Sequence, residues 1–210
     1  VGATGSITFL IIGFCNGMAS GFAIPVAQRF GAKDEQGLKL AIANSVYLGI
    51  ALSVILTLIV TTLCRPLLEF LNTPSDIIEG TYSYLIVILW GIPITFFYNL
   101  FSGFMRSLGD SKTPVLFLVM ASVINIVLDY AFIAGLGTGV EGAAYATVIS
   151  QLLAAVFSAI YMLKKYAVVR MTKIERRKDF QCMMQLLYMG LPMGMQYSIT
   201  AVGAVILQTA

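Results

Sequence analysis

The sequence predicts an all-α membrane protein, a polytopic bundle of helices that cross the bilayer several times. Of its 210 residues, 59% are hydrophobic and only 11% are charged, whereas a soluble domain carries about 25% charged residues. The apolar residues gather in runs of the roughly 20 residues that a transmembrane helix needs. The length of these runs and their lack of strict alternation argue against the strands of a membrane barrel.

Five of the apolar segments are complete, and a sixth begins near the end of the chain. We expect membrane-spanning helices over about 6–28, 40–63, 82–105, 114–134 and 141–163, and the start of another over 185–210. Short stretches with turn chemistry separate them, such as NTPSD at 72–76 and the glycine-rich 135–142. The order of segments and turns predicts antiparallel neighbours joined by short loops.

Small residues predict how two of the segments pack and bend. Gly13, Gly17 and Gly21 are spaced four apart in the first segment, so they share one face and allow another helix to approach closely. Gly91 and Pro93 predict a bend in the third segment. Such a bend is either a hinge or a proline that the bundle accommodates without movement.

Several classes of function are excluded or disfavoured by what the sequence lacks. There is no histidine, so imidazole metal sites and histidine-based catalysis are excluded. Cys15, Cys64 and Cys182 show no metal-site or disulfide spacing, and we interpret them as packing residues. We expect no enzymatic activity and no nucleic-acid partner.

The basic residues predict the orientation in the membrane. Of the 13 Lys and Arg residues, 12 lie in three connections on one side, within 29–39, 106–113 and 164–184, and the other side has only Arg65. By the positive-inside rule these three connections are cytoplasmic; the family resemblance described below implies that the membrane is the cell's inner (plasma) membrane. The first segment then enters from outside, so we expect at least one helix before it.

The stretch 164–184 is the only long polar connection, and it allows two interpretations. Its basic residues interleave with apolar ones such as Val168, Val169 and Met171. It either lies on the inner membrane surface and binds anionic lipid, or it is a solvated linker between two bundles.

An acidic residue lies inside the fourth segment, in the run VINIVLDYAF. Asp129 is the only charge between Lys112 and Glu141. An ionised carboxylate that faces lipid costs a few kcal/mol even on lenient scales, so it should face the interior of the bundle. Asn125 is one turn earlier and shares its face, and Ser122 extends that face.

The fifth segment carries a second polar stripe, which includes Thr147 and Gln151. At 1.5 Å per residue, Asp129 lies about 8 Å and Thr147 about 9 Å from the outer ends of their helices. A carboxylate, the Asn125 amide and a hydroxyl therefore converge in the outer half of the bundle. Their oxygens suit a hard cation such as Na⁺, and the carboxylate alone suits a proton. The alternative is that Asp129 is a structural anchor between helices.

A third stripe, on the third segment, includes Thr95 and Asn99. Asn99 lies about 10 Å from the inner end of its helix, too deep to join the Asp129 cluster unless the bend shifts it. It either lines a cavity or bonds to a neighbouring helix.

Four stretches resemble the multidrug and toxic compound extrusion (MATE) family, and the resemblance covers nearly the whole chain. They are VAQRFGAKDE (26–35), MRSLGDSKTP (105–114), NIVLDYAFIAGLGTGVEGAAYATVISQ (125–151) and MGLPMGMQYSI (189–199). The most specific part is Asn-Ile-Val-Leu-Asp followed by Gly-Ala-Ala and Ala-Thr at family-like spacing.

The resemblance implies that the segments are helices two to seven of a two-lobe transporter. Residues 1–163 are then five of the six helices of the N-lobe, 164–184 connect the lobes, and 185–210 begin the C-lobe. Asn125, Asp129 and Thr147 match the asparagine, aspartate and threonine of the N-lobe cation site in this family. Its other aspartate lies on helix one, outside this chain.

The function implied is an antiporter, coupled to Na⁺ or H⁺, that exports organic and often cationic compounds by alternating access. Ser122, Gln151 and Asn99 would line the substrate cavity, and we expect a monomer in contact with membrane lipid. Two alternatives stay open. A lipid-linked oligosaccharide flippase of the same superfamily would more often have a cationic cavity, whereas the intramembrane charge here is acidic. A non-transporting scaffold or receptor would use Asp129 only as an anchor.

Overall fold

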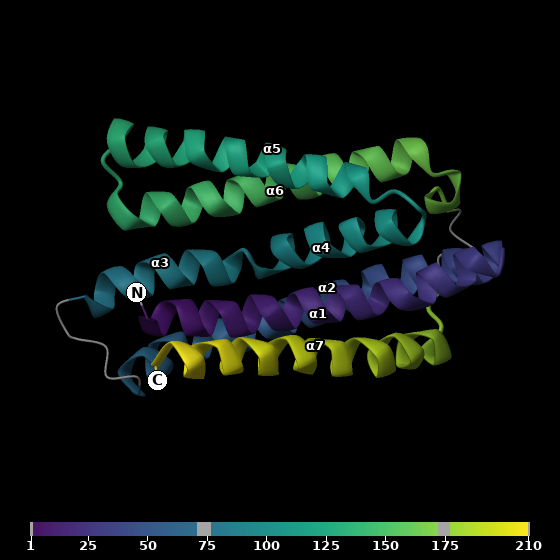
Figure 1. The fold of residues 1–210 in the computed structure, drawn as a ribbon, viewed down its shortest axis with the longest axis horizontal. Coiled ribbons are helices and arrows are strands. Elements are labelled where there is room, and N and C mark those ends of the chain that lie inside the picture. Colours follow the sequence, from purple (N-terminus) through teal and green to yellow (C-terminus); the bar gives the residue numbers. More distant parts are fainter. Residues whose placement is uncertain (1, 71–76, 172–176, 210) are drawn as a thin grey trace.

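The computed structural model describes residues 2–70, 77–171 and 177–209, and these residues form helices and short connections without a strand. Figure 1 shows the helices running roughly parallel to one long axis. In chain order they are α1 (Gly2–Gly31), α2 (Glu35–Phe70), α3 (Ile78–Trp90), α4 (Ile92–Ser107), α5 (Lys112–Asp129), the π-helix η1 (Tyr130–Gly135), α6 (Gly139–Lys165), the 3₁₀ turn η2 (Ala167–Val169) and α7 (Phe180–Thr209). The all-helical fold class predicted from the sequence is confirmed.

Among the described residues, four helices are long and apolar enough to cross a membrane, and α3 with α4 makes a fifth if the bent pair is one span. The two helices meet at an angle of 41°, at the place where Gly91 and Pro93 predict a bend. Gly91 ends α3 by donating its amide to the carbonyls of Val87 and Ile88. Pro93 is the second residue of α4, in the first turn, where its missing N–H breaks no hydrogen bond of the helix.

The helices form three groups across the bundle (Figure 1). The antiparallel pair α5–α6 lies along one side, α3 and α4 lie in the middle, and α1, α2 and α7 lie on the other side. The connections α1–α2, α4–α5 and α6–α7 meet at one end of the bundle, and these are the connections with the basic residues. The topology therefore agrees with the orientation predicted from charge.

The core lies where α1, α4 and their neighbours meet. Met18 and Phe22 of α1 and Phe96 and Phe104 of α4 are fully buried, and the rings of Phe22 and Phe96 pack edge to face with centroids 6.1 Å apart. In contrast, α2 and α5 expose many large apolar side chains. Such surfaces are expected where lipid is the solvent.

Helix α7 packs against α1 through glycines on both helices. A Cβ atom added at Gly17 would lie 2.7 Å from Gly194 Cα, and one added at Gly21 would lie 2.5 Å from Gly190 Cα. No side chain fits in such a space, so the two backbones touch. The close approach predicted for the glycine face of the first segment is confirmed, and α7 contributes a matching pair that the sequence analysis did not identify.

Helix boundaries differ from the expected ones most at α2, which runs from Glu35 to Phe70 rather than over 40–63, and around the long connection. Helix α6 ends at Lys165 and α7 begins at Phe180, so the linker between them is 166–179, shorter than the expected 164–184. Asp179 explains the early start of α7, because its carboxylate accepts the backbone amide of Cys182 at 2.9 Å and so caps the first turn. The expected turn at 72–76 and the linker residues 172–176 lie outside the described residues. The assignment of the chain to two lobes stays a prediction.

Candidate cation-binding site

The candidate site begins where α5 changes its winding. Asp129 is the last residue of α5, and the π-helix η1 follows from Tyr130 to Gly135. The wider winding is closed by a hydrogen bond from the Leu136 amide to the Ala131 carbonyl at 3.0 Å. A π-turn inserts one residue into the helical repeat, so it changes which side chains face the neighbouring helix. Such turns occur frequently at functional sites.

The carboxylate of Asp129 has an oxygen that nothing in the described part of the chain satisfies. Its Oδ1 atom is buried and has no hydrogen-bond partner there. A buried acceptor without a partner is costly, and more so when it carries charge. A bound cation or a proton on this oxygen would remove that cost.

Beside Asp129, one long polar contact joins α5 to α6. The Asn125 Nδ2 atom donates to Thr147 Oγ1 at 3.5 Å, and the Thr147 hydroxyl itself donates to the Ala143 carbonyl at 2.9 Å. Both side chains are half-buried. The structure thus places the amide and hydroxyl of the predicted cluster together, one turn from Asp129.

Gln151 and Ser122 lie on the other side of this contact. Because α5 and α6 are antiparallel, Gln151 is one turn deeper than Thr147, whereas Asp129 is one turn further out than Asn125. Each turn is roughly 6 Å along the helix, so Gln151 is not within reach of the same ion as Asp129. The Oε1 atom of Gln151 is also buried without a partner among the described residues. Ser122 is exposed and its hydroxyl donates to the Leu118 carbonyl at 3.0 Å.

Asn99 is bonded within its own helix, since its Nδ2 atom donates to the Thr95 carbonyl at 2.8 Å. It is half-buried, and no hydrogen bond among the described residues connects it to Asp129. Its role in lining a cavity therefore stays a prediction.

The donor set that remains together is Asp129, Asn125 and Thr147. It offers carboxylate, amide and hydroxyl oxygens, which suit a small hard cation such as Na⁺. The single carboxylate is also the one group of the three that binds a proton in the ordinary pH range. The chemistry of these three side chains suits either coupling ion, and the choice between the two ions is left to experiment.

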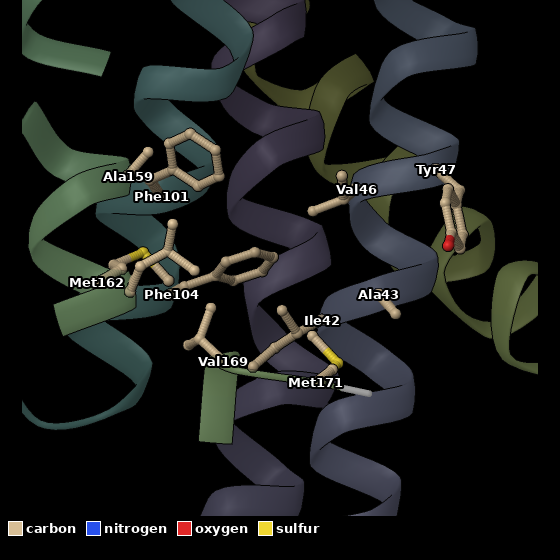
Figure 2. A pocket seen from close by; sticks show the side chains of 11 residues that line it. Ile42, Ala43, Val46, Tyr47, Phe101, Phe104, Ala159, Met162, Val169 and Met171 are labelled. Atoms are coloured by element: carbon tan, nitrogen blue, oxygen red, sulfur yellow. The ribbon is translucent and has the colours of Figure 1, made fainter. Parts of the chain in front are cut away.

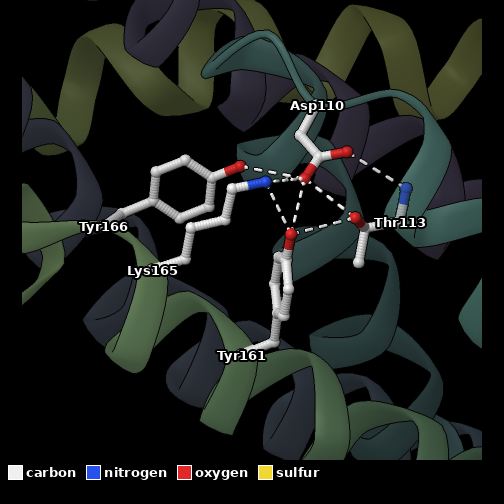
Figure 3. A network of polar contacts seen from close by, with 5 residues as sticks. All are labelled: Asp110, Thr113, Tyr161, Lys165 and Tyr166. Carbon is white, nitrogen blue, oxygen red and sulfur yellow. Dashed lines mark hydrogen bonds and ion pairs between the residues drawn. The ribbon is translucent and has the colours of Figure 1, made fainter.

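Sequence reasoning missed a second polar cluster, at the cytoplasmic end (Figure 3). The Asp110 Oδ2 atom accepts from Lys165 Nζ at 2.6 Å, from the Tyr161 and Tyr166 hydroxyls at 3.0 and 3.2 Å, and from Thr113 Oγ1 at 2.8 Å. The Thr113 amide donates to Asp110 Oδ1 at 3.1 Å. This cluster joins the α4–α5 loop to the end of α6 and the start of the linker.

The electrostatics of this cluster follow from its contacts. The hydrogen bond from Lys165, supported by those from Thr113 and Tyr161, holds the pKa of the Asp110 carboxyl well below its usual range. The preceding residue, Gly109, has φ +89°, a conformation that favours glycine, and it turns the chain so that Asp110 faces α6. The sequence contained a local signal for part of this cluster. An Asp just before a helix often accepts a hydrogen bond from a backbone amide of the first turn, as Asp110 does from Thr113.

Comparison with known proteins identifies the family. A sequence model of the MatE family matches residues 1–131, more than half of the chain. The chain belongs to the MatE family. This confirms the resemblance found in the sequence.

Curated relatives of this MatE chain are named as multidrug resistance or export proteins. It is 32% identical over 191 residues to the probable multidrug resistance protein YoeA of Bacillus subtilis (strain 168), which covers 88% of the chain and 41% of YoeA. It is 26% identical over 183 residues to the multidrug export protein MepA of Staphylococcus aureus (strain NCTC 8325 / PS 47), covering 87% of the chain and 41% of MepA. The chain thus spans less than half the length of these relatives.

Solved transporters have the same fold. The chain superposes on an inward-facing multidrug resistance MATE transporter of the MOP superfamily with a TM-score of 0.88 and 29% identity, over 96% of the chain and 46% of that structure. It also matches a MOP superfamily transporter from Pyrococcus furiosus Vc1 (DSM3638) with a TM-score of 0.86 and 31% identity, over 94% of the chain and 44% of that structure. The latter is described as having a binding pocket of reverse polarity that suggests a different function. The MatE chain is an integral membrane protein of a transporter family.

Proposed function

We propose that the protein is an antiporter, coupled to Na⁺ or H⁺, that exports organic and often cationic compounds by alternating access. The observation that carries this proposal is the buried Oδ1 atom of Asp129, which has no partner among the described residues, one turn from the Asn125–Thr147 contact. An acid in this setting costs stability, and ion or proton pathways are the usual reason that membrane helices hold one.

In the proposed cycle, Asp129 alternates between a form that holds the cation and a form that releases it. Asn125 and Thr147 supply the remaining oxygens of the bound state. The cation drives transport only if its affinity differs between the inward-open and outward-open states. The π-helix that begins at Tyr130 offers a structural cause for such a difference, because a change in its winding would rotate Asp129 relative to α6. Two lobes that rock about a midplane site give the alternation.

The sign of the intramembrane charge supports a cation rather than a phosphate-bearing substrate. The Pyrococcus furiosus relative shows that members of this superfamily differ in the polarity of their pockets. Between Lys112 and Lys164, the cytoplasmic ends of α5 and α6, the charges in this part of the chain are Asp129 and Glu141, both acidic. A lipid-linked oligosaccharide flippase would need positive charge to hold phosphate, which the interior of these two spans does not supply.

Efflux from vesicles tests the proposal. The full-length gene product would be reconstituted with a fluorescent cationic dye, under an imposed Na⁺ gradient and then under a pH gradient. The wild type would be compared with Asp129→Asn, and with Glu141→Gln as a matched control, because Glu141 is an exposed acid at the start of α6.

We expect one of the two gradients to drive efflux in the wild type and in Glu141→Gln, and not in Asp129→Asn. The effective gradient would identify the coupling ion. Equal efflux in all three proteins would remove Asp129 from the mechanism. No dye movement in any of them would favour the flippase or another substrate class.

A further inference from the structure

The strongest feature outside the candidate cation site is an apolar cavity of about 250 Å³ between α2, α4 and α6. Figure 2 shows side chains from these helices and from the linker arranged around it. Ile42 of α2, Phe104 of α4 and Met162 of α6 form its buried wall. The lining contains one polar group, the hydroxyl of Tyr47, so a polar or ionic ligand would lose its hydration there without compensation.

The cavity lies at the depth of the cytoplasmic leaflet. Ile42 is seven residues from the start of α2, and Phe104 and Met162 are each three residues from the ends of their helices. These positions are about 5–10 Å along the helix axes from the basic end of the bundle. This is the depth of the first methylenes of a phospholipid chain, since half of the hydrocarbon core is about 15 Å thick.

The cavity is open to the outside of the bundle on the α6 side. Leu163, one of the lining residues, is 47% exposed, and Ile160, one turn earlier on α6, is also exposed. A lipid chain therefore has an apolar surface to follow from the bilayer into the cavity.

The described first part of the linker, residues 166–171, covers the cytoplasmic side of the cavity. Val169 and Met171 belong to the lining and pack against the main core. Their backbone is held in turns, since the Val169 amide donates to the Tyr166 carbonyl at 3.1 Å and the Met171 amide to the Val169 carbonyl at 3.0 Å. Two apolar residues of this part are thus placed on the cavity, whereas Arg170 between them is exposed.

Positive charge surrounds this cover. Arg170 lies between the two lining residues and is exposed, with its guanidinium donating to the carbonyls of Leu163 and Lys164 at 2.6 Å. Lys178 is also exposed, and its Nζ atom lies 5.7 Å from the centroid of the Tyr47 ring at the edge of the cavity. An apolar cavity with a cationic rim complements one class of molecule, an anionic amphiphile.

We propose that this cavity binds one acyl chain of an anionic phospholipid from the cytoplasmic leaflet, with its phosphate held by Lys178 and Arg170. Residues 166–171 of the linker cover the site, so the bound lipid fixes them against α2, α4 and α6. The inference does not depend on which compound or ion the protein transports. It corresponds to the lipid-binding interpretation of the basic linker.

Photolabelling tests this site directly. The full-length protein would be placed in phosphatidylcholine vesicles with a trace of phosphatidylglycerol that carries a photoactivatable acyl chain, and the labelled peptides would be mapped. We expect label on peptides that contain Phe101–Phe104 and Ala159–Leu163. Unlabelled phosphatidylglycerol should reduce the labelling more than phosphatidylcholine does, and the transported dye should not reduce it.

Two variants and one control make the test specific. Ala159→Phe fills the cavity from α6 and should abolish the label, whereas Ala51→Phe, on an exposed part of α2, should leave it unchanged. Lys178→Gln leaves the cavity intact and should weaken competition by phosphatidylglycerol about fivefold, as expected for one lysine near an anionic lipid. The proposal is overturned if Ala159→Phe labels like the wild type, if Lys178→Gln competes like the wild type, or if the dye displaces the lipid.

Discussion

Two aspartates at opposite ends of α5 have opposite surroundings. Asp110, in the loop before α5, accepts hydrogen bonds from four side chains and one backbone amide. Asp129, at the end of α5, has a buried Oδ1 atom that no described residue satisfies. Both are carboxylates beside α6, so the difference lies in what the bundle supplies to each.

This difference separates an anchor from a candidate site. A carboxylate whose partners are all present is held in one ionisation state and fixes the elements that contact it. A carboxylate whose partners are incomplete costs stability, and a binding or release step can remove that cost. We therefore expect changes at Asp110 to affect folding and changes at Asp129 to affect ion binding.

The largest effect on stability is expected from Asp110→Ala. The change leaves the Tyr161, Tyr166 and Thr113 hydroxyls without their acceptor, and we expect a loss of about 2 kcal/mol in the free energy of unfolding. Thermal unfolding of the purified protein measures it. Asp129→Asn serves as the comparison and should unfold at or above the wild-type temperature, because it removes a buried charge. The reverse order of these two variants would contradict the assignment of anchor and site.

Acid should weaken the anchor in a defined pH range. The pKa of Asp110 is lower in the folded protein than the usual value near 3.9 in an unfolded chain. The contribution of Asp110 to the free energy of unfolding is therefore fully present above the unfolded-state pKa. It is lost as the pH falls through the folded-state pKa. The Tm difference between wild type and Asp110→Asn should be constant from neutral pH to about pH 5 and shrink below about pH 4. A difference that disappears near neutral pH would show that another group is responsible.

A smaller effect is expected from Thr147→Val in the candidate cation site. This change keeps the shape of the side chain and removes the hydroxyl oxygen. We expect affinity for the coupling cation to fall about tenfold, equivalent to about 1.4 kcal/mol, with little change in Tm. Thr61→Val is a matched control, because the Thr61 hydroxyl also donates to the carbonyl four residues earlier, at 2.7 Å, but lies on α2. Equal cation affinity in Thr147→Val and Thr61→Val would exclude Thr147 from the site.

The smallest effect is expected from Lys165→Gln. Lys165 contacts Asp110 at 2.6 Å, but its side chain is 46% exposed, so water and salt screen the pair. We expect a smaller drop in Tm than for Asp110→Ala, and one that diminishes further in high salt. Lys164→Gln, an exposed neighbour, controls for the general loss of positive charge. A drop as large as that of Asp110→Ala would mean that the ion pair, rather than the hydroxyl network, holds the loop.

Much of the fold, and part of the candidate site, could be predicted from local sequence patterns. Apolar runs predicted the spans, Gly91 and Pro93 the bend, and the glycine face of α1 the close contact with another helix. Counting residues from the outer ends placed Asp129 and Thr147 at about the same depth. The structure has Thr147 in contact with Asn125, one turn deeper on α5 than Asp129. These features depend on helical geometry, which a sequence specifies over a few turns.

The rest depends on contacts between distant parts of the chain. Asp110 and Lys165 are separated by 55 residues, and no periodic pattern indicates that they meet. The π-helix after Asp129 was also missed, because a one-residue insertion into the helical repeat leaves the apolar run unchanged. The role of Gly190 and Gly194 on α7 could not be predicted, because it depends on α1 lying against them.

The central claim is that Asp129 binds the coupling cation, and Na⁺-dependent thermal unfolding tests it most directly. Tm of the full-length protein would be measured against Na⁺ concentration at about pH 6 and about pH 8, for wild type and Asp129→Asn. A ligand at 100 times its Kd stabilises a protein by about 2.7 kcal/mol. For Na⁺ coupling we predict a rise in wild-type Tm with Na⁺ and no rise in the variant. For H⁺ coupling we predict no response to Na⁺ but a pH dependence of Tm that the variant lacks. Identical Na⁺ and pH responses in the two proteins would contradict the account.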